Sequence, residues 1–94
     1  MKFITLPSLL LSGPPQCRVG MEHFDENLLI EDIQGFSSPL REVTKLYKHN
    51  KDGVAHELRL FLVFVRLRGK DKMVVIRHES VGAANETYEK LKDL

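Results

Sequence analysis

The clearest pattern in the chain is a strand-like run near residues 55–67, where branched and aromatic side chains are frequent. Only its first part alternates between polar and apolar residues, since every position from 60 to 65 is apolar. A strand of an antiparallel sheet with one wet face alternates along its whole length. The pattern therefore predicts a central strand that is covered on both sides.

Turn-forming residues separate this run from a strand-like segment on each side. Residues 50–53 read Asn-Lys-Asp-Gly, which is the chemistry of a type I turn closed by a glycine. Residues 68–71 read Arg-Gly-Lys-Asp and form a second tight reversal. Together they predict an antiparallel β-meander with strands near 42–49, 55–67 and 72–79.

Two further segments have a helical pattern. Ser80 can cap a helix near 81–93, whose apolar stripe consists of Val81, Ala84, Tyr88 and Leu91. An amphipathic helix over 39–49, begun at Pro39, is the competing interpretation of the first meander strand. We favour the hairpin there because the turn at 50–53 follows directly.

The first 40 residues are interrupted by prolines and glycines. Their apolar stretches predict short strands, one of them over 27–33, which complete a small barrel or sandwich. The beginning of the chain superficially resembles a signal peptide, but Pro7 interrupts its apolar run and no small-residue cleavage site follows. We therefore expect a first strand over residues 1–12, a cytoplasmic protein, and no association with a membrane.

The register of the meander decides which side chains share a side. If Asn50 pairs with Val54, position 46 faces 58 and position 44 faces 60. One side then holds Leu46, Leu58, Leu60, Leu62 and Phe64. The other side is a candidate association face that holds Phe61, Val63, Val65, Leu67, Val74 and Ile76.

Neither side can remain in water. Six large apolar side chains at roughly 1.5 kcal/mol each represent about 10 kcal/mol of burial, which is comparable with the stability of a whole domain. The carboxyl-terminal helix can cover one side, and the amino-terminal strands or a second copy must cover the other. With 94 residues, the chain is expected to be one α+β domain.

Charge is distributed unevenly, although the formal net charge is only +1. Residues 1–40 carry two basic and five acidic side chains, whereas residues 41–77 carry ten basic and four acidic ones. A basic meander with an exposed tyrosine can bind a polyanion or an acidic partner. Solvated edge strands that resist aggregation explain the same charges. The candidate polyanion or partner surface consists of Lys45, Tyr47, Lys48, Lys51, Arg59, Arg66, Arg68, Lys70 and Lys72.

No motif for catalysis or for a metal is present in the sequence. The four histidines are scattered singly, and Cys17 has no neighbouring base that would activate its thiol. We expect no cofactor, no metal and no enzymatic activity. The sequence favours a non-enzymatic protein–protein interaction module, such as a small adaptor, regulator or assembly component, with a protein partner or a second copy. The alternative is a nucleic-acid-binding module that uses the basic hairpins.

Overall fold

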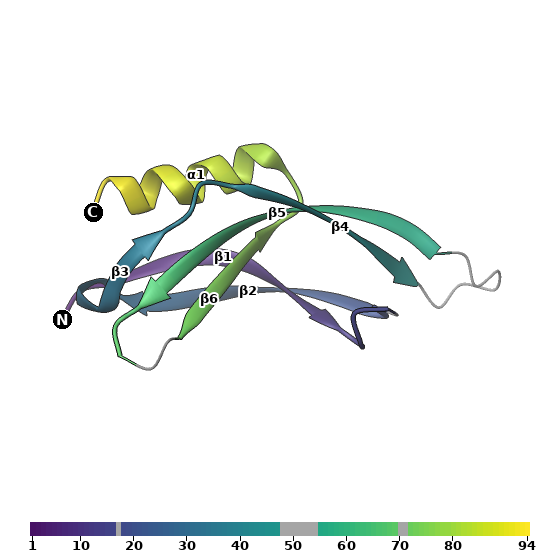
Figure 1. Cartoon of the computed structure of the whole chain (residues 1–94), viewed down its shortest axis with the longest axis horizontal. Helices are drawn as coiled ribbons and strands as arrows, with labels where there is room; N and C mark the ends of the chain where they lie inside the picture. Colours follow the sequence, from purple (N-terminus) through teal and green to yellow (C-terminus); the bar gives the residue numbers. More distant parts are fainter. Residues whose placement is uncertain (17, 48–54, 70–71) are drawn as a thin grey trace.

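The structure is a computed structural model that describes residues 1–16, 18–47, 55–69 and 72–94. Figure 1 shows a sheet, a separate hairpin and a helix. The elements described are, in chain order, β1 (Phe3–Ser12), β2 (Gly20–Leu29), the 3-10 helix η1 (Ile30–Asp32), β3 (Ile33–Phe36), β4 (Leu40–Tyr47), β5 (Ala55–Leu67), β6 (Met73–His78) and α1 (Val81–Lys92). This composition confirms the predicted α+β class.

β5 is the central strand of the larger sheet. It pairs with β6 along one edge and with β3 and then β4 along the other. Phe61, for example, has Arg41 of β4 and His78 of β6 as its two partners. All of these pairings are antiparallel, so the predicted meander and its order are confirmed.

The register of the first hairpin differs from the prediction by two residues. Leu46 lies opposite His56 rather than Leu58, and Thr44 lies opposite Leu58. The predicted turn at 50–53 lies outside the described residues. Because the shift is an even number, every side chain remains on its predicted side of the sheet. The competing helix over 39–49 is wrong, since residues 40–47 form β4.

The second hairpin, between β5 and β6, places its side chains on the predicted sides. Val63 lies opposite Ile76 and Val65 opposite Val74, so these four side chains share one side of the sheet. Below, the odd side of β5 means the side that carries Phe61, Val63, Val65 and Leu67. The even side is the one that carries Leu58, Leu60, Leu62 and Phe64.

The first part of the chain is more regular than its sequence indicates. β1 and β2 are ten-residue strands that form a two-stranded antiparallel hairpin, and β1 continues through Pro7. Among the described residues, β1 pairs with β2 along one edge and with no strand along the other. A proline, which has no backbone N–H to donate, is tolerated in such an edge strand. The single strand predicted over 27–33 is wrong. Ile30 donates its backbone N–H to the carbonyl of Lys2, and the chain then turns through η1 before β3 begins.

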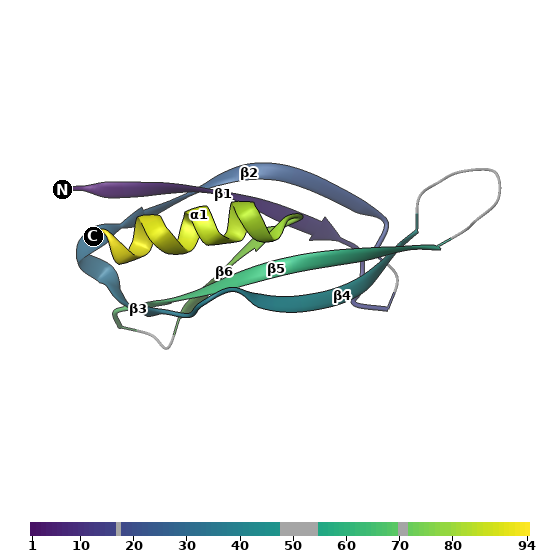
Figure 2. The same ribbon diagram turned by 90° about the horizontal axis from the view of Figure 1, so that it is seen from above.

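The hairpin crosses the outer edge of β6 and reaches both sides of β5 (Figures 1 and 2). At the crossing, the buried hydroxyl of Ser8 accepts a hydrogen bond of 3.1 Å from the backbone N–H of Arg77. Before this point Leu6 packs into a core on the odd side, and after it Leu9 packs into a core on the even side. Among the described residues neither sheet closes on itself, so the predicted barrel or sandwich is not confirmed.

α1 lies over the odd side of β5 and β6, next to the hairpin. Ser80 caps it as predicted, because its hydroxyl accepts the backbone N–H of Ala83 at 3.1 Å. Ala84 and Leu91 enter the core, and Tyr88 meets Phe36 of β3 edge to face at 5.8 Å between ring centres. The helix therefore provides one of the two covers that the central strand requires.

Candidate interaction surfaces

The predicted association face is covered within the chain. Val63, Val65 and Ile76 have no exposed surface, because α1, the hairpin and β3 enclose them. Phe61, Leu67 and Val74 are half-buried against the same core. The three fully buried side chains cannot contact another molecule in this fold. The chain's own helix and hairpin therefore supply the cover that the two-sided apolar pattern requires, and no second copy is needed on this side.

The even side of β5 is covered only in part. Leu9, Leu11 and Met21 of the hairpin pack over Leu60 and Leu62. Beyond them, towards the end of β5, four apolar side chains remain open or half-open. We call this set the open sheet patch, and it consists of Leu40, Phe64, Met73 and Val75.

The register shows that the open sheet patch is continuous. Phe64 lies opposite Val75, and Leu40 lies opposite Leu62, which precedes Phe64 on the same side. Met73 lies on the same side of β6 as Val75, because the two residues are two positions apart on the strand. Met73 is 54% exposed and Leu40 is 48% exposed. The patch is therefore an apolar surface across three neighbouring strands.

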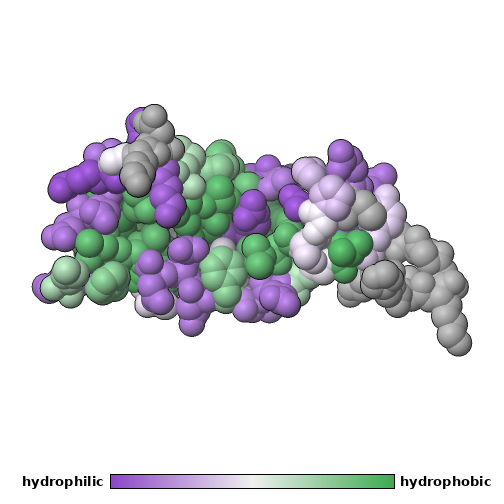
Figure 3. All heavy atoms as spheres, turned by 90° about the horizontal axis from the view of Figure 1, so that it is seen from below, coloured by the Kyte–Doolittle hydropathy of each residue, from purple (hydrophilic) through white to green (hydrophobic). Residues whose placement is uncertain are grey.

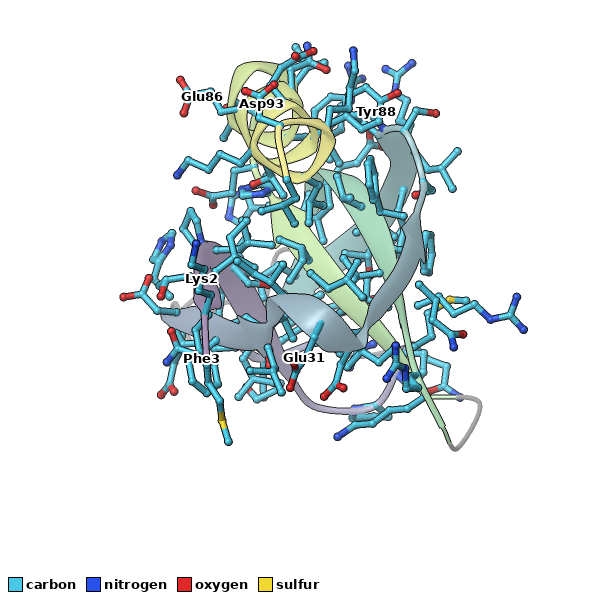
Figure 4. The ribbon with its side chains drawn as sticks, turned by 90° about the vertical axis from the view of Figure 1, so that its left-hand side faces the viewer. Lys2, Phe3, Glu31, Glu86, Tyr88 and Asp93 are labelled. Carbon is cyan, nitrogen blue, oxygen red and sulfur yellow. The ribbon has the colours of Figure 1, made fainter. Side chains whose placement is uncertain are left out.

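The hairpin adds to the side of the molecule opposite α1. Phe3, which is 58% exposed, points away from α1 there, as does Glu31 (Figure 4). Asp25 shares that side of the hairpin, because its partner Pro7 is four residues from Phe3 along β1 and therefore points to the same side. Figure 3, seen from this side, shows apolar side chains gathered over the middle of the molecule with polar ones around them.

Basic residues lie at one end of the open sheet patch. Arg66 lies opposite Met73 on the even side, and Arg68 and Lys72 follow beside the β5–β6 connection, all three exposed. Glu31 of η1 lies at the same end, because the carbonyl of its neighbour Asp32 accepts the backbone N–H of Arg68, and Asp25 of β2 is exposed on the hairpin. None of these side chains takes part in a salt bridge among the described residues. They are available to a partner.

The predicted polyanion surface does not form one site. Lys45, Tyr47 and Arg59 share the odd side of the β4–β5 hairpin, together with Arg41. Arg66, on the even side, is seven residues from Arg59 along β5, or roughly 23 Å at the usual rise of a strand. The structure thus separates Arg66, Arg68 and Lys72 from the first group. Lys48, Lys51 and Lys70 lie outside the described residues.

The group on the odd side has mixed exposure and charge. Lys45 and Arg59 are exposed, whereas Tyr47 is half-buried and donates its backbone N–H to the carbonyl of Arg18. Arg59 also contacts the carboxylate of Glu57 at 3.2 Å, with both side chains more than half exposed. Such an exposed pair contributes little to stability.

A small cavity of about 240 Å³ lies where the hairpin meets the start of α1. Ser8, His23, His78 and Ser80 are among its lining residues. His78 is 5% exposed, and its Nε2 lies 2.7 Å from the hydroxyl of Thr87 in α1. Burial lowers the pKa of His78 below 6.5; Glu86 opposes this shift and Lys90 adds to it.

The described residues contain no group of three or more histidine, cysteine or carboxylate side chains placed to hold a metal ion. Cys17 lies outside the described residues. None of the described helices is both long and apolar enough to cross a membrane. The Ser8 hydroxyl joins the hairpin to β6 through Arg77, and the Thr87 hydroxyl joins α1 to β6 through His78.

Sequence reasoning missed the open sheet patch as a surface. The pattern placed Phe64 on the apolar even side, but it did not reveal that the hairpin covers only half of that side. Comparison with known proteins adds no further assignment, since no protein family, curated protein or solved structure matches the chain.

Proposed function

We propose that the protein is a non-enzymatic protein–protein interaction module that binds its partner through the open sheet patch. The observation that carries this proposal is the partial cover of the even side. Leu60 and Leu62 are buried beneath the hairpin, while Leu40, Phe64, Met73 and Val75 continue the same apolar surface into the open.

The chemistry of the patch supports this function. A contiguous exposed apolar area with a polar rim is typical of a protein interface. Phenylalanine and methionine are enriched in such interfaces, and arginine is enriched at their energetic centres. Phe64 and Val75 are already held in place by packing against the core on the even side, so little side-chain entropy is lost on binding.

Site-specific photo-crosslinking tests the proposal directly. Benzoylphenylalanine is introduced in place of Met73, and the protein is irradiated in its native cells. Val81 in α1 is a matched control position, because it is 53% exposed and Met73 is 54% exposed. We expect protein adducts from position 73 that exceed those from position 81. Equal or absent adducts at position 73 would contradict the function.

Nucleic-acid binding is a second candidate, favoured by the grouping of Arg41, Lys45 and Arg59 with Tyr47 on one side of the β4–β5 hairpin. Three cations and an aromatic ring on one strand pair can contact a phosphate backbone and stack on a base. Fluorescence anisotropy with labelled single- and double-stranded oligonucleotides at about 50 and 200 mM salt tests it.

The structure supplies a matched comparison for that experiment. Replacing Lys45 and Arg59 by alanine should abolish salt-sensitive binding, whereas replacing Arg66 and Arg68 should leave it nearly unchanged. Binding that survives the first pair of substitutions, or no binding by the folded protein at low salt, excludes this second function.

A further inference from the structure

We propose that the outer edge of β4 over residues 41–45, here called the β4 edge, binds an extended acidic segment of another protein, which adds to the larger sheet as a further strand. The β4 edge is separate from the open sheet patch, so this inference goes beyond the function proposed above and is tested independently of it. Two observations carry it. They are the backbone groups that this edge leaves unpaired and the single sign of the charges along one of its sides.

The hydrogen bonds of β5 show which neighbouring strand each of its residues faces. Ser37, which lies between β3 and β4, donates its N–H to the carbonyl of Phe64, and its hydroxyl accepts the N–H of Phe64 at 3.0 Å. Both backbone groups of Phe64 therefore point towards the edge of β5 that β3 and β4 occupy. Successive residues of a regular strand bond alternately to its two neighbours, so the even-numbered residues of β5 bond to β4.

It follows that every second residue of β4 directs its backbone groups outward. Glu42 and Thr44 lie opposite even-numbered residues of β5 and are bonded within the sheet. Arg41, Val43 and Lys45 have their N–H and C=O groups on the outer edge instead. Among the described residues, no backbone hydrogen bond from another element reaches Arg41 or Val43. The β4 edge therefore presents unpaired donors and acceptors to an incoming strand.

The chain itself already pairs with the end of this edge. Tyr47 donates its N–H to the carbonyl of Arg18, and Arg18 forms a parallel bridge with Leu46. This contact confirms that the odd-numbered residues of β4 face outward, and it shows that the sheet accepts backbone pairing on this side. The length that remains open before Arg18 is residues 40–44, which is close to the usual strand length of about five residues.

The side chains of the β4 edge determine the chemistry of the partner. Arg41, Val43 and Lys45 are exposed on the odd side, Val43 to 53%. Neither cation takes part in a salt bridge among the described residues. Side chains directly opposite each other on neighbouring strands lie roughly 5 Å apart, so an added strand is complementary when it places acidic residues opposite the two cations and an apolar residue opposite Val43. The expected pattern in the partner is acidic-x-apolar-x-acidic.

The same charges disfavour pairing between two copies of the β4 edge. If two such edges were aligned on Val43, cations would lie opposite cations in either strand direction, and like charges opposite each other are destabilising. Arg41 and Lys45 thus protect the edge from self-association, as charged residues on edge strands do, while they attract a strand of the opposite charge. In strand addition of this kind, main-chain hydrogen bonds provide affinity and alternate side chains provide specificity.

Amide hydrogen exchange with a designed peptide tests the inference. The probe is Thr-Glu-Thr-Val-Thr-Glu-Thr, which has the same residue order in both directions, and the control peptide has lysine in place of glutamate. NMR of the isotope-labelled protein follows the exchange of each backbone amide. In the free protein, the amides of Arg41 and Val43 should exchange faster than those of Glu42 and Thr44. The acidic peptide should slow exchange at Arg41 and Val43, and the lysine peptide should not.

Two pairs of variants separate an added strand from simple charge attraction. Val43→Pro removes an N–H that β5 does not use, whereas Val43→Thr keeps that N–H and nearly the same shape. The proline variant should bind the acidic peptide at least about tenfold more weakly than the threonine variant. Arg41→Glu with Lys45→Glu should lose the acidic peptide and bind the lysine peptide, while Arg66→Glu with Arg68→Glu, at the other end of β5, should bind like the wild type. Circular dichroism confirms that each variant is folded.

Three results overturn the inference. They are slow exchange of the Arg41 and Val43 amides in the free protein, no change in their exchange with the acidic peptide at concentrations up to about 1 mM, or peptide binding that a folded Val43→Pro variant retains in full. The last result would mean that the cations attract any polyanion, as the nucleic-acid alternative requires. Crosslinking at position 73 reports on the open sheet patch alone, so failure of the proposed function is recognised separately.

Discussion

The two sides of β5 have similar apolar residues but different surroundings. On the odd side, α1, β3 and the beginning of the hairpin enclose Val63, Val65 and Ile76 completely. On the even side, the far end of the hairpin covers Leu60 and Leu62, and the surface then continues uncovered to Phe64 and Met73. One helix and one hairpin thus close one side and half of the other. The remaining half is the candidate interface.

A buried charge gives the largest expected contrast between the two sides. Val65→Glu places a carboxylate in the closed core, where its desolvation has no compensation, and should prevent stable folding. Met73→Glu, on the open patch, should change the free energy of unfolding by no more than about 0.5 kcal/mol. Urea unfolding followed by circular dichroism measures both. A folded Val65→Glu protein of native stability would show that the odd side is not a closed core.

Truncation of a leucine tests where the cover on the even side ends. Leu60→Ala should cost about 2–5 kcal/mol, because Leu60 has no exposed surface beneath the hairpin. Leu40→Ala removes the same atoms from a half-exposed position on the same side and should cost clearly less. Chemical unfolding of the two variants gives the comparison. Equal losses of stability would mean that the cover over Leu60 extends to Leu40 as well.

A smaller effect is expected where α1 meets β6. Thr87→Val keeps the shape of a buried side chain but removes the hydroxyl that lies 2.7 Å from Nε2 of His78. The loss of this hydrogen bond should lower the free energy of unfolding by about 1–2 kcal/mol. Thermal unfolding at neutral pH is the measurement. No change in stability would show that water replaces the hydroxyl.

The pH dependence of folding is expected to include His78. Burial lowers its pKa, so the folded state binds fewer protons than the unfolded state at mildly acidic pH. The free energy of unfolding is therefore unaffected by this histidine above pH 6.5, and it decreases as the pH falls from 6.5 towards the lowered pKa. His78→Gln should flatten that decline, as measured by urea unfolding above and below pH 6.5. An unchanged decline in the variant would assign it to other groups.

The meander and the helix could be predicted because their signals are local. Strand-forming residues, a reversal near 68–71 and the cap at Ser80 each act within a few positions. The sides of the sheet could also be predicted, since alternation survives a register error of two residues. The candidate basic surface was grouped by charge alone, although the same alternation puts Arg59 and Arg66 on opposite sides and distant parts of one strand.

The first part of the chain shows why the rest was not predictable. Pro7 suggests an interruption, yet β1 continues through it, because among the described residues β1 is paired along one edge only and its other edge needs no N–H donor. The run at 27–33 suggests a strand, yet η1 divides it, and the carbonyl of Asp32 accepts the backbone N–H of Arg68. Both outcomes depend on residues far away in the sequence.

By itself, the amino-acid sequence determined that β5 is a strand with two apolar sides, that both sides need cover, and that a capped helix follows β6. These properties depend on side-chain chemistry and short-range geometry. Only the tertiary structure decided what covers each side, since one hairpin crosses β6 at Ser8 and divides its apolar residues between two cores. The length and path of that hairpin, relative to the length of β5, leave the open sheet patch uncovered.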